Sequence, residues 1–239
     1  MAVYDISGAE IQGKNVNEQW AGKKAAFLGD SITYGVRTTK TYWQYLKDML
    51  DLASVSGYGV DGSTISSKSN PMYGRITNIA SDNDVAFLFG GTNDFFGNVA
   101  MGDWYTTSGG TRTFDETVTT FRGALNHTLL MLIDKFPTKN IILLTPIHRN
   151  TFQTQLTDMQ SNTQGLYLED YVDAVREVGS IFSVNVIDLY HDSGLFPYDS
   201  DNATAYFNTA NSDKLHPNAT GHERIAKCIA AHMAAIACN

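Results

Sequence analysis

The feature that most constrains the fold is a regular alternation of short apolar runs with segments of helical periodicity. The apolar runs end at Gly, Pro or Asp and have the length of buried parallel strands. They cover residues 25–29, 54–59, 85–90, 140–145 and 184–189, and the helical patterns cover 42–52, 114–136, 164–182 and 219–236. The alternation predicts a single-domain, three-layer α/β/α sandwich around a five-stranded parallel sheet, with the flavodoxin-like strand order 2-1-3-4-5.

The pattern over residues 114–136 is the clearest helical one, because apolar side chains recur at helical spacing. Asp115 and Glu116 suit the N-terminal end of the helix dipole, and Pro137 ends the pattern.

Length and charge narrow the class of protein. The 239 residues suffice for one large domain, which we assign to residues 21–239, with residues 1–20 as an N-terminal extension. A net charge of −8 without a Lys/Arg cluster argues against a nucleic acid partner. No apolar run is long enough for integral membrane contact, and the first twenty residues do not resemble a signal peptide. The compartment stays open between the cytoplasm and a piece of a secreted or larger protein, as does the oligomeric state.

Polar motifs follow four of the predicted strands. Ser31 comes directly after the first strand, Gly59 ends the second, Asn93 follows the third, and His148 and Arg149 follow the fourth. Ligands of doubly wound sheets bind beyond the carboxyl ends of the strands, so the four loops converge on one edge.

A serine that attacks an ester needs a neutral imidazole as base, an acceptor that orients the imidazole, and donors for the developing oxyanion. Ser31 is the candidate nucleophile, although a serine at this position can also be a helix N-cap. His216 is the candidate base, and Pro217 favours a firm junction before the last helix. Asp213 stands three residues earlier, where a turn can bring its carboxylate to the ring. The alternative is a surface histidine beside an unpartnered loop carboxylate.

Three groups are candidate oxyanion donors. Asn93 offers a side-chain amide, although Asn after two glycines also suits a turn. Ser31 and Gly59 offer backbone N–H groups, with Gly57 and Gly62 competing for the second role.

Together these blocks resemble the SGNH hydrolase superfamily, the GDSL-type lipases and esterases. The matching blocks begin at Gly29-Asp30-Ser31, Tyr58-Gly59, Gly91-Thr92-Asn93-Asp94 and Asp213-Lys214-Leu215-His216. The resemblance implies Ser31 as nucleophile, His216 as base and Asp213 as its orienting partner, with an oxyanion hole formed by Ser31, Gly59 and Asn93. One departure is Gly57, where the family often has Asn. The larger α/β-hydrolase class is disfavoured, because Thr33 stands where its Gly-x-Ser-x-Gly elbow has the second glycine.

The long segments between elements are the candidates for substrate contact. Phe95 and Trp104 lie in residues 95–113, which form either one wall of the site or a self-packed loop. His148 is the third substrate-binding candidate. Residues 190–212 are expected to hold the Asp/His turn. The remaining histidines are read as surface or helix-face residues: His127, His191, His222 and His232.

The sequence therefore predicts a carboxylic-ester hydrolase that works through an acyl-serine intermediate, without a metal or organic cofactor. Polar, Thr- and Asn-rich loops favour a small acyl group such as acetyl on a carbohydrate, so the expected partner is a small-molecule or glycan ester. The alternatives are a lysophospholipase or thioesterase for longer acyl chains, and a non-catalytic glycan-binding module on the same fold.

Overall fold

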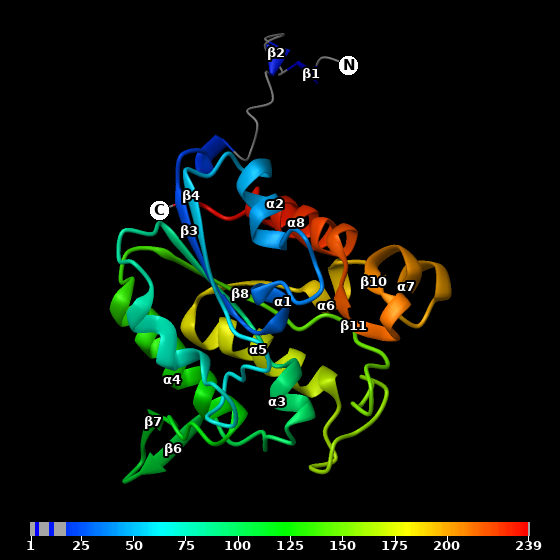
Figure 1. Ribbon diagram of the computed structural model, residues 1–239. Coiled ribbons are helices and arrows are strands. Elements are labelled where there is room, and N and C mark those ends of the chain that lie inside the picture. The colour runs from blue at the N-terminus through cyan, green and yellow to red at the C-terminus, as the bar shows by residue number, and fades with distance from the viewer. Residues whose placement is uncertain (1–2, 5–9, 12–17, 239) are drawn as a thin grey trace.

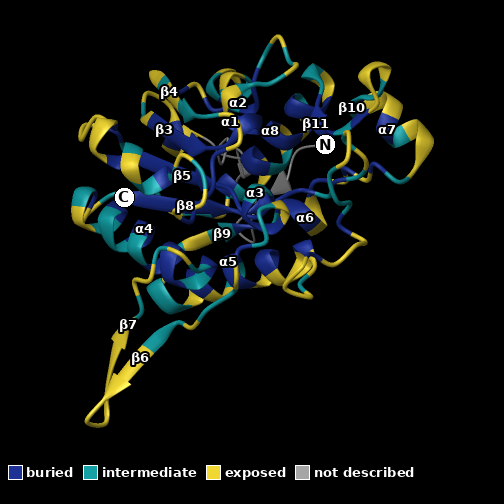
Figure 2. Cartoon of the chain, turned by 60° about the horizontal axis from the view of Figure 1, so that its bottom comes forward, coloured by how far each residue is buried: buried dark blue, intermediate teal, exposed yellow. Residues whose placement is uncertain are grey.

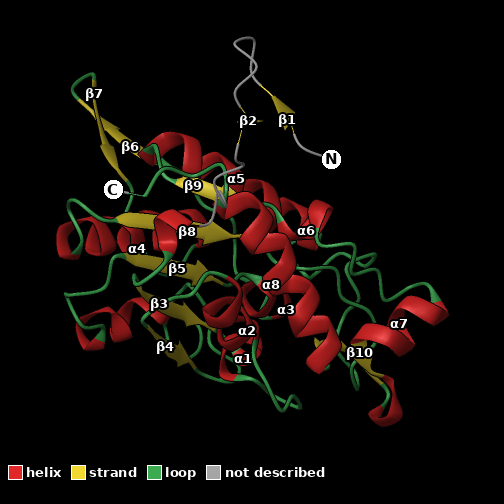
Figure 3. Cartoon of the chain, turned by 90° about the horizontal axis from the view of Figure 1, so that it is seen from above, coloured by secondary structure: helices red, strands yellow, loops and turns green. Residues whose placement is uncertain are grey.

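The computed structural model describes residues 3–4, 10–11 and 18–238, and a parallel five-stranded sheet forms the centre of this described part. Its strands, named in chain order, are β3 (Lys24–Gly29), β4 (Ser54–Gly59), β5 (Val85–Phe89), β8 (Asn140–Leu144) and β9 (Asn185–Ile187). They lie in the order β4-β3-β5-β8-β9, which can be followed in Figure 3, and Figure 1 shows the sheet among its helices. The predicted fold class and strand order are confirmed, and three two-stranded pairs outside the sheet were not predicted.

Helices cover both faces of the sheet, as Figure 3 shows from above. Successive strand residues point to opposite faces, so Ala26 and Leu28 belong to one apolar cluster and Ala25 and Phe27 to the other. The first cluster packs against η2 (Met72–Asn78), α4 (Phe121–Lys135) and α5 (Leu168–Phe182), and the second against α2 (Tyr42–Met49) and α8 (Ala219–Met233).

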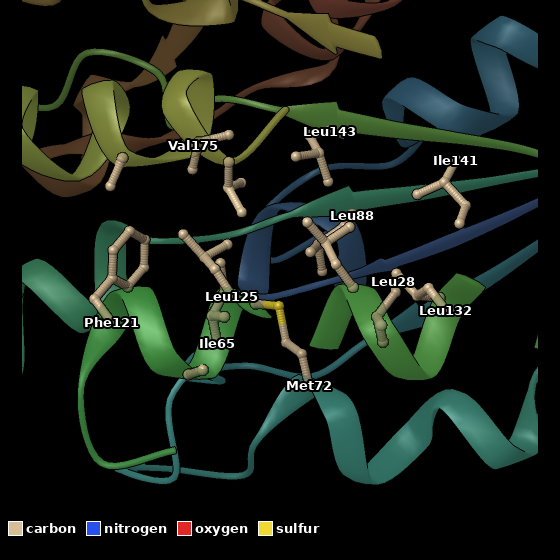
Figure 4. Packing of buried hydrophobic residues seen from close by; sticks show 14 of the residues in the cluster. Leu28, Ile65, Met72, Leu88, Phe121, Leu125, Leu132, Ile141, Leu143 and Val175 are labelled. Carbon is tan, nitrogen blue, oxygen red and sulfur yellow. The ribbon is translucent and has the colours of Figure 1, made fainter. Parts of the chain in front are cut away.

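The first cluster is a continuous apolar layer (Figure 4). Leu28, Leu88 and Leu143 stand side by side on β3, β5 and β8 in register, and they face Leu125 of α4 and Val175 of α5. Because these strands are covered on both faces, they are apolar throughout rather than alternating. The packing fixes the edge at which the strands end and the polar loops begin.

Helix α4 begins at Phe121 rather than at residue 114, so this part of the prediction is wrong. Phe114 instead ends strand β7 (Thr111–Phe114), which pairs with β6 (Tyr105–Ser108) in a hairpin that projects from the body (Figure 2). Gly109 and Gly110 both have positive φ, which suits a tight hairpin turn. Asp115 and Glu116 therefore precede α4 rather than filling its first turn.

Helix α5 starts at Leu168, four residues later than the predicted 164, because Gly165 has a φ of +75° outside the helical region. The segment between β9 and α8 contains α6 (Leu189–Asp192), α7 (Ser200–Tyr206), β10 (Phe207–Asn208), η3 (Thr209–Asn211) and β11 (Asp213–Pro217). Strand β10 pairs with β11, and the Asn208 amide donates to the His216 carbonyl at 2.7 Å. The segment thus holds the Asp/His turn, as expected.

The predicted N-terminal extension falls largely outside the described residues. Strands β1 (Val3–Tyr4) and β2 (Glu10–Ile11) pair with each other. Trp20, in η1 (Glu18–Trp20), is fully buried, and its indole N–H donates to the Met233 carbonyl at 2.9 Å. Trp20 therefore packs with the domain rather than with an extension. Among the described helices, none is long and apolar enough to cross a membrane.

Candidate active site

Strand β3 delivers Ser31 to the first position of a one-turn helix, α1 (Ser31–Tyr34). The N-cap of this helix is Asp30, whose carboxylate accepts from the Ile32 N–H at 3.0 Å. Burial raises the pKa of Asp30 to about 7. Because Asp30 caps the helix, the Ser31 hydroxyl is available for another partner.

That partner is His216 on β11. The Ser31 Oγ lies 3.1 Å from Nε2 of His216, and Nδ1 of the same ring lies 2.9 Å from Oδ2 of Asp213. All three side chains are buried to at least nine-tenths. The structure therefore brings the three residues, 185 positions apart at their extremes, into one hydrogen-bonded row. Figure 2 looks onto this edge of the sheet, where α1 and β11 meet.

Asp213 is held as a carboxylate by its own turn. Its Oδ1 accepts from the backbone N–H groups of Leu215 and His216, both at 3.0 Å. Burial alone would raise the pKa of Asp213, but the hydrogen bonds from the His216 ring and backbone outweigh it. The net pKa lies below the usual range. An ionised Asp213 fixes the ring so that Nδ1 donates and Nε2 can accept the serine proton.

Two further residues contact this row, and no local pattern marks them in the sequence. Arg37 places Nη1 3.3 Å from Oδ2 of Asp213. Phe152 packs edge-to-face on the His216 ring at a centroid distance of 5.1 Å, and the Arg37 guanidinium lies 5.3 Å from the Phe152 ring centre. Both residues restrict the movement of the imidazole and its carboxylate, and both reach it only through the tertiary fold.

Gly59 ends β4 in register with Gly29 and lies against α1. A Cβ at Gly59 would stand 2.1 Å from the Tyr34 nitrogen and 2.5 Å from the Thr33 carbonyl carbon. Only glycine allows this close approach. The departure from the family pattern at Gly57 also has a physical reason, since a Cβ there would meet the Trp43 ring at 2.7 Å.

Asn93 lies on α3 (Thr92–Phe96), directly after β5, and is half-buried. Its Nδ2 donates to the Ser63 carbonyl at 2.9 Å, which engages one of the two amide hydrogens. Neighbouring Asp94 is fully buried and accepts from the N–H groups of Ile65 and Ser66, both at 2.9 Å. Burial raises the pKa of Asp94 to about 6. Asp94 therefore fastens the loop beside Asn93, a role that the sequence did not reveal.

Arg75 on η2 joins the strand ends around the site. Its guanidinium donates to the carbonyls of Gly29 at 2.9 Å, Tyr58 at 3.2 Å and Asn70 at 2.9 Å. It also donates to the Ser63 hydroxyl at 2.9 Å. The ends of β3 and β4 and the loop that follows β4 are thus held by one side chain.

A pocket of about 270 Å³ opens beside Asn93. Its walls are Gly62, Thr64, Lys68, Ser69, Asn93, Phe96, Gly97 and Gln155. Phe95, predicted to contact substrate, is fully buried against Tyr171, so that prediction is wrong. The neighbouring Phe96 lines the pocket instead.

The structure does not bring Trp104 or His148 to this pocket. The Trp104 indole donates to Glu177 of α5 at 2.9 Å, and Arg122 of α4 lies over its ring. His148 pairs with Asp158 at 2.7 Å, and its ring centre is 3.8 Å from that of Tyr190.

His222 lies on α8, in agreement with the helix-face alternative, and it is fully buried rather than on the surface. Its Nδ1 accepts from the backbone N–H of Tyr42, the first residue of α2, at 3.1 Å. The ring thus joins α8 to α2 from within the core.

Comparison with known proteins identifies the class of protein that has this fold and this arrangement of residues. The GDSL-like lipase/acylhydrolase family matches residues 27–224. The chain belongs to this family, and with it to the SGNH hydrolase superfamily; it is a hydrolase that acts on ester bonds. No curated protein matches the chain.

Solved structures share the fold over nearly the whole chain. A protein from Lactobacillus plantarum is 29% identical with a TM-score of 0.76, over 90% of this chain and 98% of that one. A possible lipase from Chitinophaga pinensis DSM 2588 is 24% identical with a TM-score of 0.64, over 88% and 97%. The lipase/acylhydrolase from Enterococcus faecalis is 19% identical with a TM-score of 0.59, over 89% and 96%. At these two lower identities the likeness is one of fold.

Proposed function

We propose that the protein is a serine esterase in which Ser31 is the nucleophile, His216 the general base and Asp213 the residue that orients it. The observation that carries the proposal is the row of hydrogen bonds from Ser31 Oγ through the His216 ring to Asp213, at 3.1 and 2.9 Å. A hydroxyl, an imidazole and a buried carboxylate in this order are the components of nucleophilic acyl transfer.

In the first step, Ser31 Oγ attacks the ester carbonyl carbon while Nε2 of His216 takes the hydroxyl proton. The charge that develops on the carbonyl oxygen is stabilised by the N–H groups of Ser31 and Gly59 and by the second amide hydrogen of Asn93. Asp213 stabilises the imidazolium, which then protonates the departing alcohol. Water, deprotonated by the same imidazole, attacks the acyl-serine and releases the acid and the free Ser31 hydroxyl.

The pocket beside Asn93 supports a short acyl ester as substrate. Its volume of about 270 Å³ lies below the usual range for drug-sized ligands. Its walls carry hydroxyl, amide and ammonium groups, with Phe96 as one aromatic side chain. These features favour an O-acetyl ester of a carbohydrate or another polar alcohol over a long acyl chain.

Ser31→Ala tests the assignment. We expect kcat/KM toward p-nitrophenyl acetate to fall by roughly a thousandfold or more, because no other group can form the acyl-enzyme. A fluorophosphonate should label wild type at Ser31 and leave the variant unlabelled. The matched control is Ser69→Ala, which removes a hydroxyl from the pocket wall but leaves Ser31 and His216 in place. This variant should still be labelled. Undiminished turnover by the correctly folded Ser31→Ala protein would refute the proposal.

A further inference from the structure

We propose that the pocket beside Asn93 is an anion-selective subsite, so that the preferred ester carries a negatively charged group close to its ester bond. This inference rests on the proposed esterase function and names the substrate class of the same site. Its basis is a concentration of hydrogen-bond donors and positive charge along the pocket, with no carboxylate among the lining residues.

Lys68 supplies the exposed cation of the subsite. Its stem is held against Gly97, since a Cβ at that glycine would lie 3.3 Å from the Lys68 Cγ. No ion pair joins the Lys68 ammonium to a carboxylate within the described residues, in contrast to Lys40 and Lys227. The ammonium is therefore available to a ligand that enters the pocket.

Gln155 supplies a neutral donor on the pocket wall. Its Oε1 accepts from Nη2 of Arg149 at 2.5 Å. With the oxygen engaged by the guanidinium, the Gln155 amide N–H groups are left for a ligand. A ligand group that accepts hydrogen bonds is thus favoured over one that donates them.

Arg149 places a second positive charge behind the wall. Its side chain is fully buried, with the guanidinium carbon 5.9 Å from the Phe96 ring centre and Nη1 3.0 Å from the Thr92 hydroxyl. Its Nε has no hydrogen-bond partner within the described residues. Burial lowers the pKa of Arg149 to about 10, so the guanidinium remains charged at neutral pH.

The carboxylates near this region are not part of the pocket wall, and one of them, Asp158, accepts from the Arg149 backbone N–H at 3.1 Å behind it. Asp94 is turned onto the N–H groups of the 65–66 segment, and Asp158 is paired with His148 and accepts from the Tyr198 hydroxyl. Asp61 is exposed and adjoins Gly62, but it is not part of the pocket wall. The Lys68 ammonium is therefore not neutralised within the pocket, where a carboxylate with a few carbon atoms fits the volume. The charge of Arg149 behind the wall is balanced in part by Asp158, Asp30 and Asp213.

The test compares two pairs of similar esters, each with one anionic and one neutral member. Ethyl hydrogen succinate against ethyl pentanoate places the charge on the acyl side, and 4-acetoxybenzoate against its methyl ester places it on the alcohol side. We expect wild type to prefer the anionic member of one pair, and the pair concerned identifies which half of the ester occupies the pocket. Lys68→Gln should lower that ratio of kcat/KM values about three- to tenfold, and Lys68→Glu should lower it further.

Lys227→Gln is the matched control, because Lys227 lies on α8 and pairs with Glu223. It should leave both the ratio and the activity unchanged. The wild-type preference should also weaken when the ionic strength is raised. If all four esters are hydrolysed but the ratio is the same in wild type and the Lys68 variants, the subsite is refuted while the esterase function stands. If wild type hydrolyses none of a wider ester panel, the esterase function itself fails.

Discussion

Gly59 is the residue at which a single added methyl group should disturb both folding and catalysis. A Cβ there would overlap the backbone of α1 at the Tyr34 nitrogen and the Thr33 carbonyl carbon. These are backbone atoms that cannot rotate away, so Gly59→Ala must displace the turn that carries Ser31. We expect a loss of about 2 kcal/mol or more in the free energy of unfolding, and a fall in kcat larger than the change in KM.

Gly74→Ala is the control for this substitution. Gly74 lies on η2, has no positive φ, and has no atom within 4 Å of a built Cβ. Its variant should match wild type in denaturant unfolding and in ester turnover. If Gly59→Ala behaves like Gly74→Ala, the close packing of β4 on α1 does not position the nucleophile.

The sequence predicts those site residues that stand at a fixed spacing from one another or from the end of a strand. Asp213 and His216 are three residues apart, and Ser31 directly follows a strand, so a local pattern reports their geometry. Arg37 reaches Asp213 across most of the chain, and nothing near Arg37 in sequence indicates that contact. The choice between Phe95 and Phe96 depends on how one short helix turns, which the apolar pattern does not resolve.

At the scale of elements, η2 acts through Arg75 as a connection between the ends of β3 and β4 and the loop after β4. Arg75→Met keeps much of the aliphatic stem but removes donors from the Gly29, Tyr58 and Asn70 carbonyls. We expect kcat for a short acyl ester to fall about tenfold or more with a smaller change in KM, because the proposed oxyanion donors would lose their fixed spacing.

The control is Arg112→Met, on the exposed hairpin strand β7, where the guanidinium lies over the Tyr105 ring. Steady-state kinetics and thermal unfolding of both variants make the comparison. Equal kcat values for the two variants would show that Arg75 does not hold the site.

Strands buried on both faces are predicted well from the sequence. The bounds of β3, β5 and β8 lie within one residue of the expected ones, because continuous apolar runs between turn residues leave few alternatives. The half-buried or exposed strand β4 has the expected bounds as well, whereas β9, which is only partly buried, is three residues shorter than expected. The sequence places the start of α4 too early, because Phe114 and Val118 continue the helical apolar spacing backwards from Phe121. The hairpin before it is exposed, so burial imposes no pattern there, and its pairing depends on the Gly109-Gly110 turn.

For the whole molecule, two buried titratable groups near Tyr42, the carboxyl of Asp30 and the imidazole of His222, contribute to stability with opposite pH dependence. The Tyr42 hydroxyl lies 3.0 Å from the Thr33 hydroxyl on α1, the helix that Asp30 caps, and the Tyr42 N–H donates to His222. Burial raises the pKa of Asp30 to about 7 and lowers that of His222 to about 3. Each group therefore stays neutral in the folded protein over a range in which it would be charged in the unfolded chain.

The signs of the two contributions differ. Between about pH 4 and 7 the folded state holds a proton on Asp30 that the unfolded state releases, so this contribution to stability is lost as the pH rises. Between about pH 6.5 and 3 the unfolded state takes up a proton on His222 that the folded state refuses, so this contribution is lost as the pH falls. Each group changes the free energy of unfolding by at most about 1.4 kcal/mol per pH unit. In wild type the two changes offset each other where the two pH ranges overlap.

Single variants should separate the two slopes. Asn is a good N-cap, so Asp30→Asn keeps the cap of α1 while it removes the carboxyl titration, and His222→Gln keeps an acceptor for the Tyr42 N–H without a titrating ring. Relative to wild type, Asp30→Asn should lose stability as the pH falls from 7 to 4, because the His222 term is no longer offset. His222→Gln should gain stability relative to wild type over the same interval, whether or not the substitution itself changes the free energy of unfolding at pH 7. Urea unfolding at half-unit pH steps measures both curves. Parallel curves for the two variants would mean that these buried groups do not set the pH dependence of folding.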